Sequence, residues 1–169
     1  QSPTNNNNIV ISAACEKKFL HYIQSNFGLF IHSHQYENLR NHIKNACKTR
    51  PHASADEYLD DLASRQCSAK EIDRLIADIT VGESYFFRDK EQMGFLKNYF
   101  LPTLIEQKRQ AKQQSIRIWS AGCANGQELS SIAIMLYELL PDLKDWSLTL
   151  IGSDIDRLAV EKAKKGIYN

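Results

Sequence analysis

Small residues and acids between residues 116 and 156 have the types and spacing best suited to chemistry. Gly122, Ala124 and Gly126 let the backbone turn sharply and leave room for a ligand to approach the main chain. Asp154 ends a second β-branched segment, where its carboxylate can accept hydrogen bonds from both hydroxyls of a ribose. Glycine-rich loops mostly serve turns, so the loop alone is weak evidence for a ligand site. Its position between two predicted strands strengthens that evidence. The pattern predicts a βαβ unit that holds a nucleoside.

The loop departs from the dinucleotide fingerprint. It reads Ser120-x-Gly122-x-Ala124-x-Gly126 rather than Gly-x-Gly-x-x-Gly, and its acid lies further downstream than the usual ~20 residues. This difference favours an adenosyl ligand without a pyrophosphate over NAD. S-adenosylmethionine is the candidate that follows from this reasoning.

The elements that must position the loop follow from periodicity and breakers. We predict a strand at 116–120, a helix at 127–140 ended by Pro141, a strand at 147–153, and a helix at 157–165 closed by Gly166. The first helix should face the sheet with Leu129, Ile132, Ala133, Leu136 and Leu140. Trp119, in the first strand, is expected in the core.

The leading half of the chain is predicted to be a helical domain at 10–80, after a disordered tail at 1–9 and before an α/β domain at 81–169. Ser54 with Glu57, and Ser68 with Glu71, have capping-box spacing. Apolar stripes predict two earlier helices, the first closed by Gly28. A longer helix from residue 89 into the 110s should bend or split at Pro102.

Composition narrows the classes of function. A formal charge of +1 on 169 residues gives no net attraction to nucleic acid, and no apolar run reaches the ~20 residues that cross a bilayer. The chain is therefore predicted to be cytoplasmic, without membrane insertion. Its scattered cysteines and histidines predict reduced, structural thiols and no metal site.

The predicted sheet has an unmet requirement. Two parallel strands with two helices do not bury both faces of a parallel sheet, as such sheets require. We therefore expect either a fragment of a longer fold or a second chain that completes the sheet, including a dimer with exchanged elements.

Two motifs together carry a family resemblance. They are Thr80-Val-Gly-Glu-Ser-Tyr-Phe-Phe-Arg-Asp89, and Trp119-Ser-Ala-Gly-Cys-Ala-Asn-Gly-Gln-Glu128 followed by Gly152-Ser-Asp-Ile-Asp-Arg157 and Lys165-Gly-Ile-Tyr168. From about residue 10 to its end, the chain resembles the N-terminal part of the CheR chemotaxis receptor methyltransferases. The resemblance implies a helical domain joined to the first βαβα part of a class I, Rossmann-like α/β methyltransferase fold.

The resemblance also implies a function and a site. The family transfers a methyl group from S-adenosylmethionine to glutamate side chains on receptor helices, leaving S-adenosylhomocysteine. The implied partner is a methyl-accepting chemotaxis receptor or a related signalling protein. The implied cofactor contacts are Gly82, Ser84, Arg88, Gly122, Glu128 and Asp154. The family usually has Asn and Thr at the first two positions, and Thr, Glu and Pro at those of Asn125, Gln127 and Leu129.

Several side chains keep two interpretations. Phe86 and Phe87 either wall the pocket or, as we prefer, pack in a core. Arg88 is the one predicted catalytic residue, as a clamp for a carboxylate, with a surface ion pair as the alternative. Asp154 is assigned to the ligand and Asp156 to the helix cap.

The predicted activity is O-methylation of receptor glutamates. Because a glutamate side chain is already ionised at neutral pH, the transfer needs no general base. One alternative is a non-catalytic module that binds S-adenosylmethionine or S-adenosylhomocysteine and signals to a partner. Another is a helical interaction module beside a degenerate nucleotide domain. Arg40, Lys44 and Lys48 form a basic stripe that either docks an acidic receptor helix or is simply a solvated face.

Overall fold

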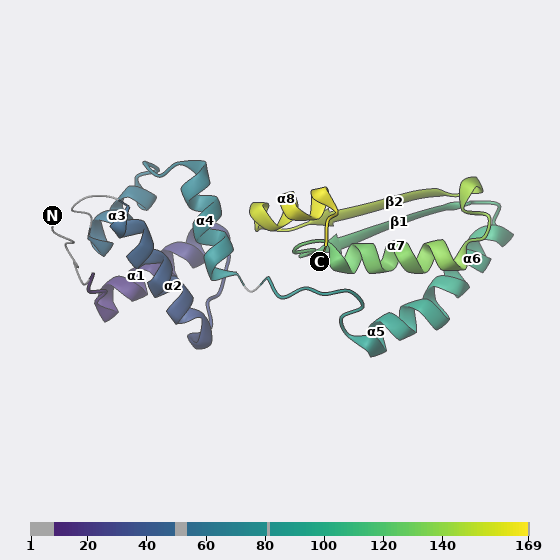
Figure 1. The fold of residues 1–169 in the computed structure, drawn as a ribbon, viewed down its shortest axis with the longest axis horizontal. Helices are drawn as coiled ribbons and strands as arrows, with labels where there is room; N and C mark the ends of the chain where they lie inside the picture. The colour runs from purple at the N-terminus through teal and green to yellow at the C-terminus, as the bar shows by residue number, and fades with distance from the viewer. Residues whose placement is uncertain (1–8, 50–53, 81, 169) are drawn as a thin grey trace. The chain divides into compact units, whose positions relative to one another are not determined.

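The computed structural model describes residues 9–49, 54–80 and 82–168. The chain divides into two compact units, Gln1–Val81 and Gly82–Asn169. The first is helical and the second is α/β (Figure 1). Most of the predicted tail, residues 1–8, lies outside the described residues.

Amphipathic helices build the first unit around one apolar core. They are α1 (Ala13–Phe27), the short η1 (Ser33–Gln35), α2 (Tyr36–Lys48), α3 (Ala55–Ala63) and α4 (Ala69–Ile79). Each α-helix turns one apolar stripe inward, and the fully buried side chains include Phe19, Ile23, Leu39, Ile43, Leu62, Leu75 and Ile79.

Local capping sets the ends of these helices as predicted. Gly28 ends α1 in the left-handed conformation, with φ of +68°. Ser54 and Glu57 form a complete capping box at the start of α3, and Ser68 and Glu71 form another at the start of α4. These caps satisfy amides that have no partner inside the helix.

Arg40 is less available for docking an acidic partner than the predicted basic stripe of Arg40, Lys44 and Lys48 requires. Its guanidinium lies 2.5 Å from the Glu16 carboxylate and 3.5 Å from that of Glu37. The hydrogen bond to Glu16 is the main reason why the pKa of Arg40 is raised. One of the three cations is therefore neutralised inside the unit, whereas the roles of Lys44 and Lys48 in docking stay predictions.

The second unit follows the predicted order of elements. Its elements are α5 (Lys90–Phe95), η2 (Leu96–Phe100), α6 (Leu101–Gln110), β1 (Ser115–Ala121), α7 (Gln127–Leu139), η3 (Leu143–Asp145), β2 (Ser147–Ser153) and α8 (Arg157–Lys165). The predicted strand and helix bounds hold to within about one residue, which is the precision expected at element ends.

The helix before the sheet changes its winding at Pro102. The segment η2 is π-helical, and the Leu101 amide bonds to the carbonyl of Leu96, five residues earlier. Proline cannot donate an amide and clashes one turn back, so the wider turn relieves the conflict. Thr103 helps by donating its hydroxyl to the Tyr99 carbonyl at 2.7 Å. The predicted split is therefore wrong: the helix continues through Pro102, and a π segment precedes the proline.

The strands β1 and β2 pair in parallel, with Ile118 opposite Leu150, and α7 runs along one face of them (Figure 1). Residues on that face alternate with exposed ones along each strand. Trp119 is on the outward face and is 69% exposed, so its predicted place in the core is wrong. Its indole instead donates to the Ser153 hydroxyl at 2.9 Å.

The core of the second unit lies between the inward face of the sheet and the helices. As predicted, α7 buries Ile132 and Leu136, with Leu140 just after its end, and it also buries Met135. Leu129 and Ala133 are only half-buried. The helix therefore meets the sheet along the stripe that its sequence indicated, shifted slightly around its axis.

All four cysteines are buried, and Cys15 and Cys123 carry free thiols. No helix in the described ranges is both long enough and apolar enough to cross a membrane. Within those same residues, no cluster of three His, Cys, Asp or Glu side chains is arranged to hold a metal ion.

Candidate functional site

The loop between β1 and α7 takes a conformation that small residues favour. Gly122, Ala124 and Gly126 all have positive φ, at +79°, +45° and +87°. The amides of Gly122 and Cys123 donate to the Ser153 carbonyl, at 2.7 and 2.9 Å, and so tie the loop to the end of β2. Among the described residues other than its chain neighbours, no heavy atom lies within 4 Å of the Cβ position of Gly122, which leaves space beside the main chain.

Asp154 fastens this loop to the turn after β2. Its carboxylate oxygens accept one amide each, from Ala124 and from Asp156, both at 2.8 Å. Asp156 caps α8 by accepting from the Leu158 and Ala159 amides, as predicted. Because each carboxylate oxygen has two acceptor positions, Asp154 keeps one free on each oxygen for a ligand. Its structural role was not foreseen from the sequence.

Glu128 stands in the first turn of α7, on the same side as the loop. The hydroxyl of Ser120, which is only 4% exposed, donates to its Oε1 at 2.7 Å. This contact orients the carboxylate while leaving the residue exposed. A negative charge there is also favoured by the N-terminal end of the helix dipole.

Cys123 fills the space between the loop and β2. A Cβ on Gly152 would lie 2.9 Å from the Cys123 sulfur, so only glycine fits opposite this thiol. Burial raises the pKa of Cys123, and the charge of Asp154 raises it further. Cys123 is therefore a packed thiol rather than a reactive thiolate.

Ser131 joins the two sequence motifs in space. It is fully buried, its hydroxyl accepts from the Phe87 amide at 2.9 Å, and it donates to the Gln127 carbonyl at 2.7 Å. Phe87 itself has a φ of +54°, which is unusual for a bulky residue. Sequence reasoning missed Ser131, although a serine inside the apolar stripe of a helix is a signal that could have identified it.

The other predicted site residues lie on the segment that Ser131 holds. Gly82 is exposed, and no heavy atom of the described chain beyond its immediate neighbours lies within 4 Å of its Cβ position. Arg88 is 53% exposed and donates to the backbone carbonyl of Glu83. Its guanidinium also lies 3.8 Å from the Glu83 carboxylate and 5.9 Å from the centre of the Tyr85 ring. These contacts direct Arg88 toward its own loop.

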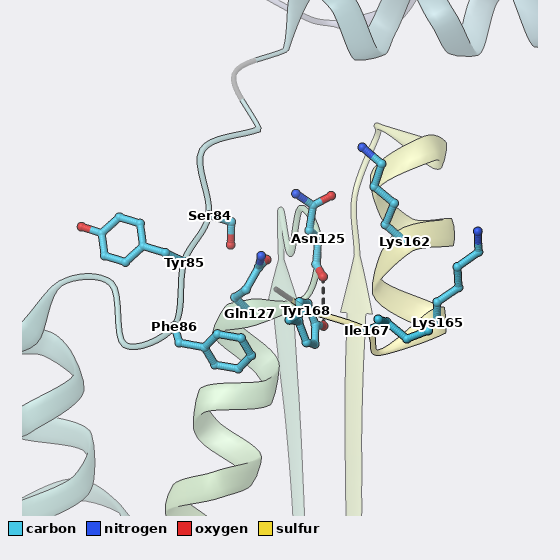
Figure 2. A pocket seen from close by; sticks show the side chains of 9 residues that line it. All are labelled: Ser84, Tyr85, Phe86, Asn125, Gln127, Lys162, Lys165, Ile167 and Tyr168. Carbon is cyan, nitrogen blue, oxygen red and sulfur yellow. Dashed lines mark hydrogen bonds between the residues drawn. The ribbon is translucent and has the colours of Figure 1, made fainter.

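A pocket of about 350 Å³ opens beside the glycine loop (Figure 2). The Phe86 ring meets the Tyr168 ring edge-on at 5.0 Å, and the Tyr168 hydroxyl donates to the Asn125 carbonyl at 3.0 Å. Phe86 and Phe87 are 36% and 38% exposed, so the preferred core packing is wrong for both. The lining residues are Ser84, Tyr85, Phe86, Asn125, Gln127, Lys162, Lys165, Ile167 and Tyr168.

These features fit an adenosyl ligand. The pocket is within the size range of small-molecule sites and has an aromatic wall. The Gln127 side-chain oxygen is buried and has no partner among the described residues, so it can accept a hydrogen bond from a ligand. The open space at Gly122 leaves the main chain accessible, and the Asp154 carboxylate has acceptor capacity that a hydroxyl donor could use.

A parallel βαβ unit with a glycine loop after β1 and an acid after β2 defines a nucleotide-binding α/β domain. Residues 82–169 match the family model described as CheR methyltransferase, SAM binding domain. The chain belongs to this family, which confirms the resemblance inferred from its two motifs.

Relatives align along most of the chain. It is 29% identical over 164 residues to a chemotaxis protein methyltransferase of Borreliella burgdorferi. That alignment covers 96% of this chain and 58% of the relative. It is 31% identical over 163 residues to chemotaxis protein methyltransferase 2 of Vibrio cholerae, covering 96% and 55%. A chemotaxis protein methyltransferase of Salmonella typhimurium is 28% identical over 160 residues, covering 95% and 52%. The chain thus spans about half the length of these relatives.

Proposed function

We propose that this protein acts in S-adenosylmethionine-dependent O-methylation of glutamate side chains on chemotaxis receptors. The supporting observation is the glycine loop, which Ser153 and Asp154 hold open in a chain of the CheR family. The relatives named as chemotaxis methyltransferases support the receptor as the partner.

In this proposal, residues from both motifs hold the cofactor. The main chain at Gly122 admits the nucleoside, while Asp154 and Glu128 accept hydrogen bonds from its polar groups. The segment at Gly82, Ser84 and Arg88 closes over it from the other side. When bound, S-adenosylmethionine supplies an electrophilic methyl group on its sulfonium sulfur.

The chain's own residues then have a limited chemical task. A glutamate side chain has an ordinary pKa of about 4.3, so at neutral pH the acceptor is already a carboxylate and no base is required. The rate comes from orienting that carboxylate and from excluding water. We assign the orienting role to Arg88, whose planar guanidinium can bind a carboxylate through two hydrogen bonds. To do so, it must leave its contacts with Glu83.

The test begins with calorimetric titration of S-adenosylhomocysteine into this chain. Transfer to a purified chemotaxis receptor is then measured with the full-length protein. Arg88→Ala should reduce cofactor affinity or turnover by about ten-fold or more, the scale of one charged hydrogen bond. Arg117→Ala, an exposed arginine of β1, is the matched control. Unchanged affinity and turnover in Arg88→Ala would refute its assignment.

The non-catalytic module remains the competing proposal, because Arg88 is directed into its own loop. Cofactor binding without methyl transfer by the full-length protein would favour that module. Absence of cofactor binding would refute both proposals and favour the helical interaction module.

A further inference from the structure

Two lysines give the pocket beside the glycine loop a positive charge. Lys162 and Lys165 are the charged members of the described lining, and Figure 2 shows both on α8 at one side of the pocket. Neither forms a salt bridge with a described residue, whereas Lys164 lies 2.7 Å from the Glu161 carboxylate. That hydrogen bond is the main reason why the pKa of Glu161 is lowered, with smaller contributions from Lys165 and Arg157. The pocket therefore favours an anion.

Gln127 lines the same pocket and carries a buried side-chain oxygen. The Gln127 side-chain oxygen has no hydrogen-bond donor among the described residues, and such an atom costs free energy until it gains one. The wall beside it is apolar, formed by the edge-on contact of Phe86 and Tyr168. A ligand that matches these features carries a carboxylate, an N–H donor close to it, and an apolar body.

The positions of these lysines have a simpler explanation, stabilisation of the end of α8. A comparison with a third lysine of the same helix separates that explanation from ligand binding. Cations in the last turn of a helix interact favourably with its dipole, and Lys162, Lys164 and Lys165 all belong to the last turn of α8. Lys164 shares this helix end but does not line the pocket. Any effect confined to the other two lysines therefore belongs to the pocket.

We propose that Lys162, Lys165 and Gln127 form a subsite for an amino-acid group, in which the ammonium groups bind the carboxylate and the Gln127 oxygen accepts from the neighbouring N–H. The proposal rests on the proposed function, which offers two sources of this chemistry. One is the amino-acid end of the cofactor, and the other is an acidic residue of the acceptor protein.

The experiment compares Lys162→Gln/Lys165→Gln with Lys164→Gln in the same chain. Calorimetry measures the affinity of four probes. Two are S-adenosylhomocysteine and 5′-methylthioadenosine, which lacks the amino-acid group; the other two are a synthetic glutamate peptide and its glutamine counterpart. If the subsite holds the cofactor, the double variant binds S-adenosylhomocysteine about ten-fold more weakly but methylthioadenosine equally well. If it holds the acceptor, only binding of the glutamate peptide weakens. Either loss should shrink in high salt.

Gln127→Met gives an independent measurement, because it removes the buried acceptor at similar length. It should weaken the same probe while leaving the thermal midpoint unchanged or raised, since an unpaired buried oxygen is lost. Equal effects of Lys164→Gln and the double variant would overturn the subsite. So would unchanged binding of every probe in the double variant. Failure of the unsubstituted chain to bind S-adenosylhomocysteine would instead refute the proposed function.

Discussion

Replacing Gly126 with alanine should destabilise the second unit more than the same change at Gly122. Both glycines have positive φ, at +87° and +79°, so alanine costs about 1–2 kcal/mol of backbone strain at either position. Only at Gly126 does the added Cβ meet other atoms, 2.9 Å from the Ala163 Cβ and 3.0 Å from the Tyr168 hydroxyl. Because α8 must shift to make room, overpacking adds about 1–3 kcal/mol.

The free energy of unfolding should therefore fall by about 2–5 kcal/mol for Gly126→Ala and by about 1–2 kcal/mol for Gly122→Ala. Urea unfolding followed by tryptophan fluorescence measures this change. Both tryptophans, Trp119 and Trp146, belong to the second unit, and Trp146 is 7% exposed. The signal is thus independent of the helical unit.

Ala163→Gly provides a further control, because it removes the methyl group that the new side chain would strike. In a double-mutant cycle, Gly126→Ala and Ala163→Gly together should cost less than the sum of the separate losses. Equal destabilisation at Gly122 and Gly126, with no coupling to Ala163, would refute the close packing of α8 against the loop.

Two further predictions concern buried groups near the site. Ser131→Ala leaves the Phe87 amide without its acceptor, so that amide should exchange with solvent about ten-fold faster or more. Ser130→Ala is the control, because the Ser130 hydroxyl makes only a long contact of 3.4 Å, with the Tyr168 hydroxyl. Equal exchange rates of the Phe87 amide in both variants would contradict the hydrogen bond between Phe87 and Ser131. Burial raises the pKa of Cys123 in the folded state, so its contribution to stability is lost as pH rises through that raised value, after being fully present below the ordinary thiol pKa of about 8.5. Above the ordinary thiol pKa, the free energy of unfolding of Cys123→Ala should therefore depend less on pH than that of the unsubstituted protein. An unchanged pH dependence would contradict the raised pKa of Cys123.

Local signals predicted most of the secondary structure. The capping pairs at Ser54 and Ser68, and the closing glycines at 28 and 166, satisfy amides and carbonyls within a few residues. Such contacts need no distant partner, so their spacing in the sequence is sufficient. The strand at 147–153 matched because its β-branched and apolar run is bounded by clear breaks.

Predictions that depended on which face is covered were less successful. Trp119 is apolar, yet it is 69% exposed, because α7 covers only one face of the sheet. Phe87, in the segment before α5, is 38% exposed. Composition shows that a side chain can be buried, but only the arrangement of helices shows what lies against it. The same limit hid Ser131, whose partner is 44 residues away.

The sequence by itself determined the order of helices and strands, the glycine loop with its acids, and the resemblance to the family, because these depend on local hydrogen bonding and residue spacing. The tertiary structure alone decided that Asp154 fastens the loop, that Ser131 joins the two motifs, and that Arg88 turns toward Glu83. It also placed Lys162 and Lys165 beside Gln127 in one pocket. Apart from the contact of Arg88 with Glu83, which is five residues away, each of these depends on residues distant in sequence meeting in space. Pairing of the strands and packing of α7 and α8 bring those residues together.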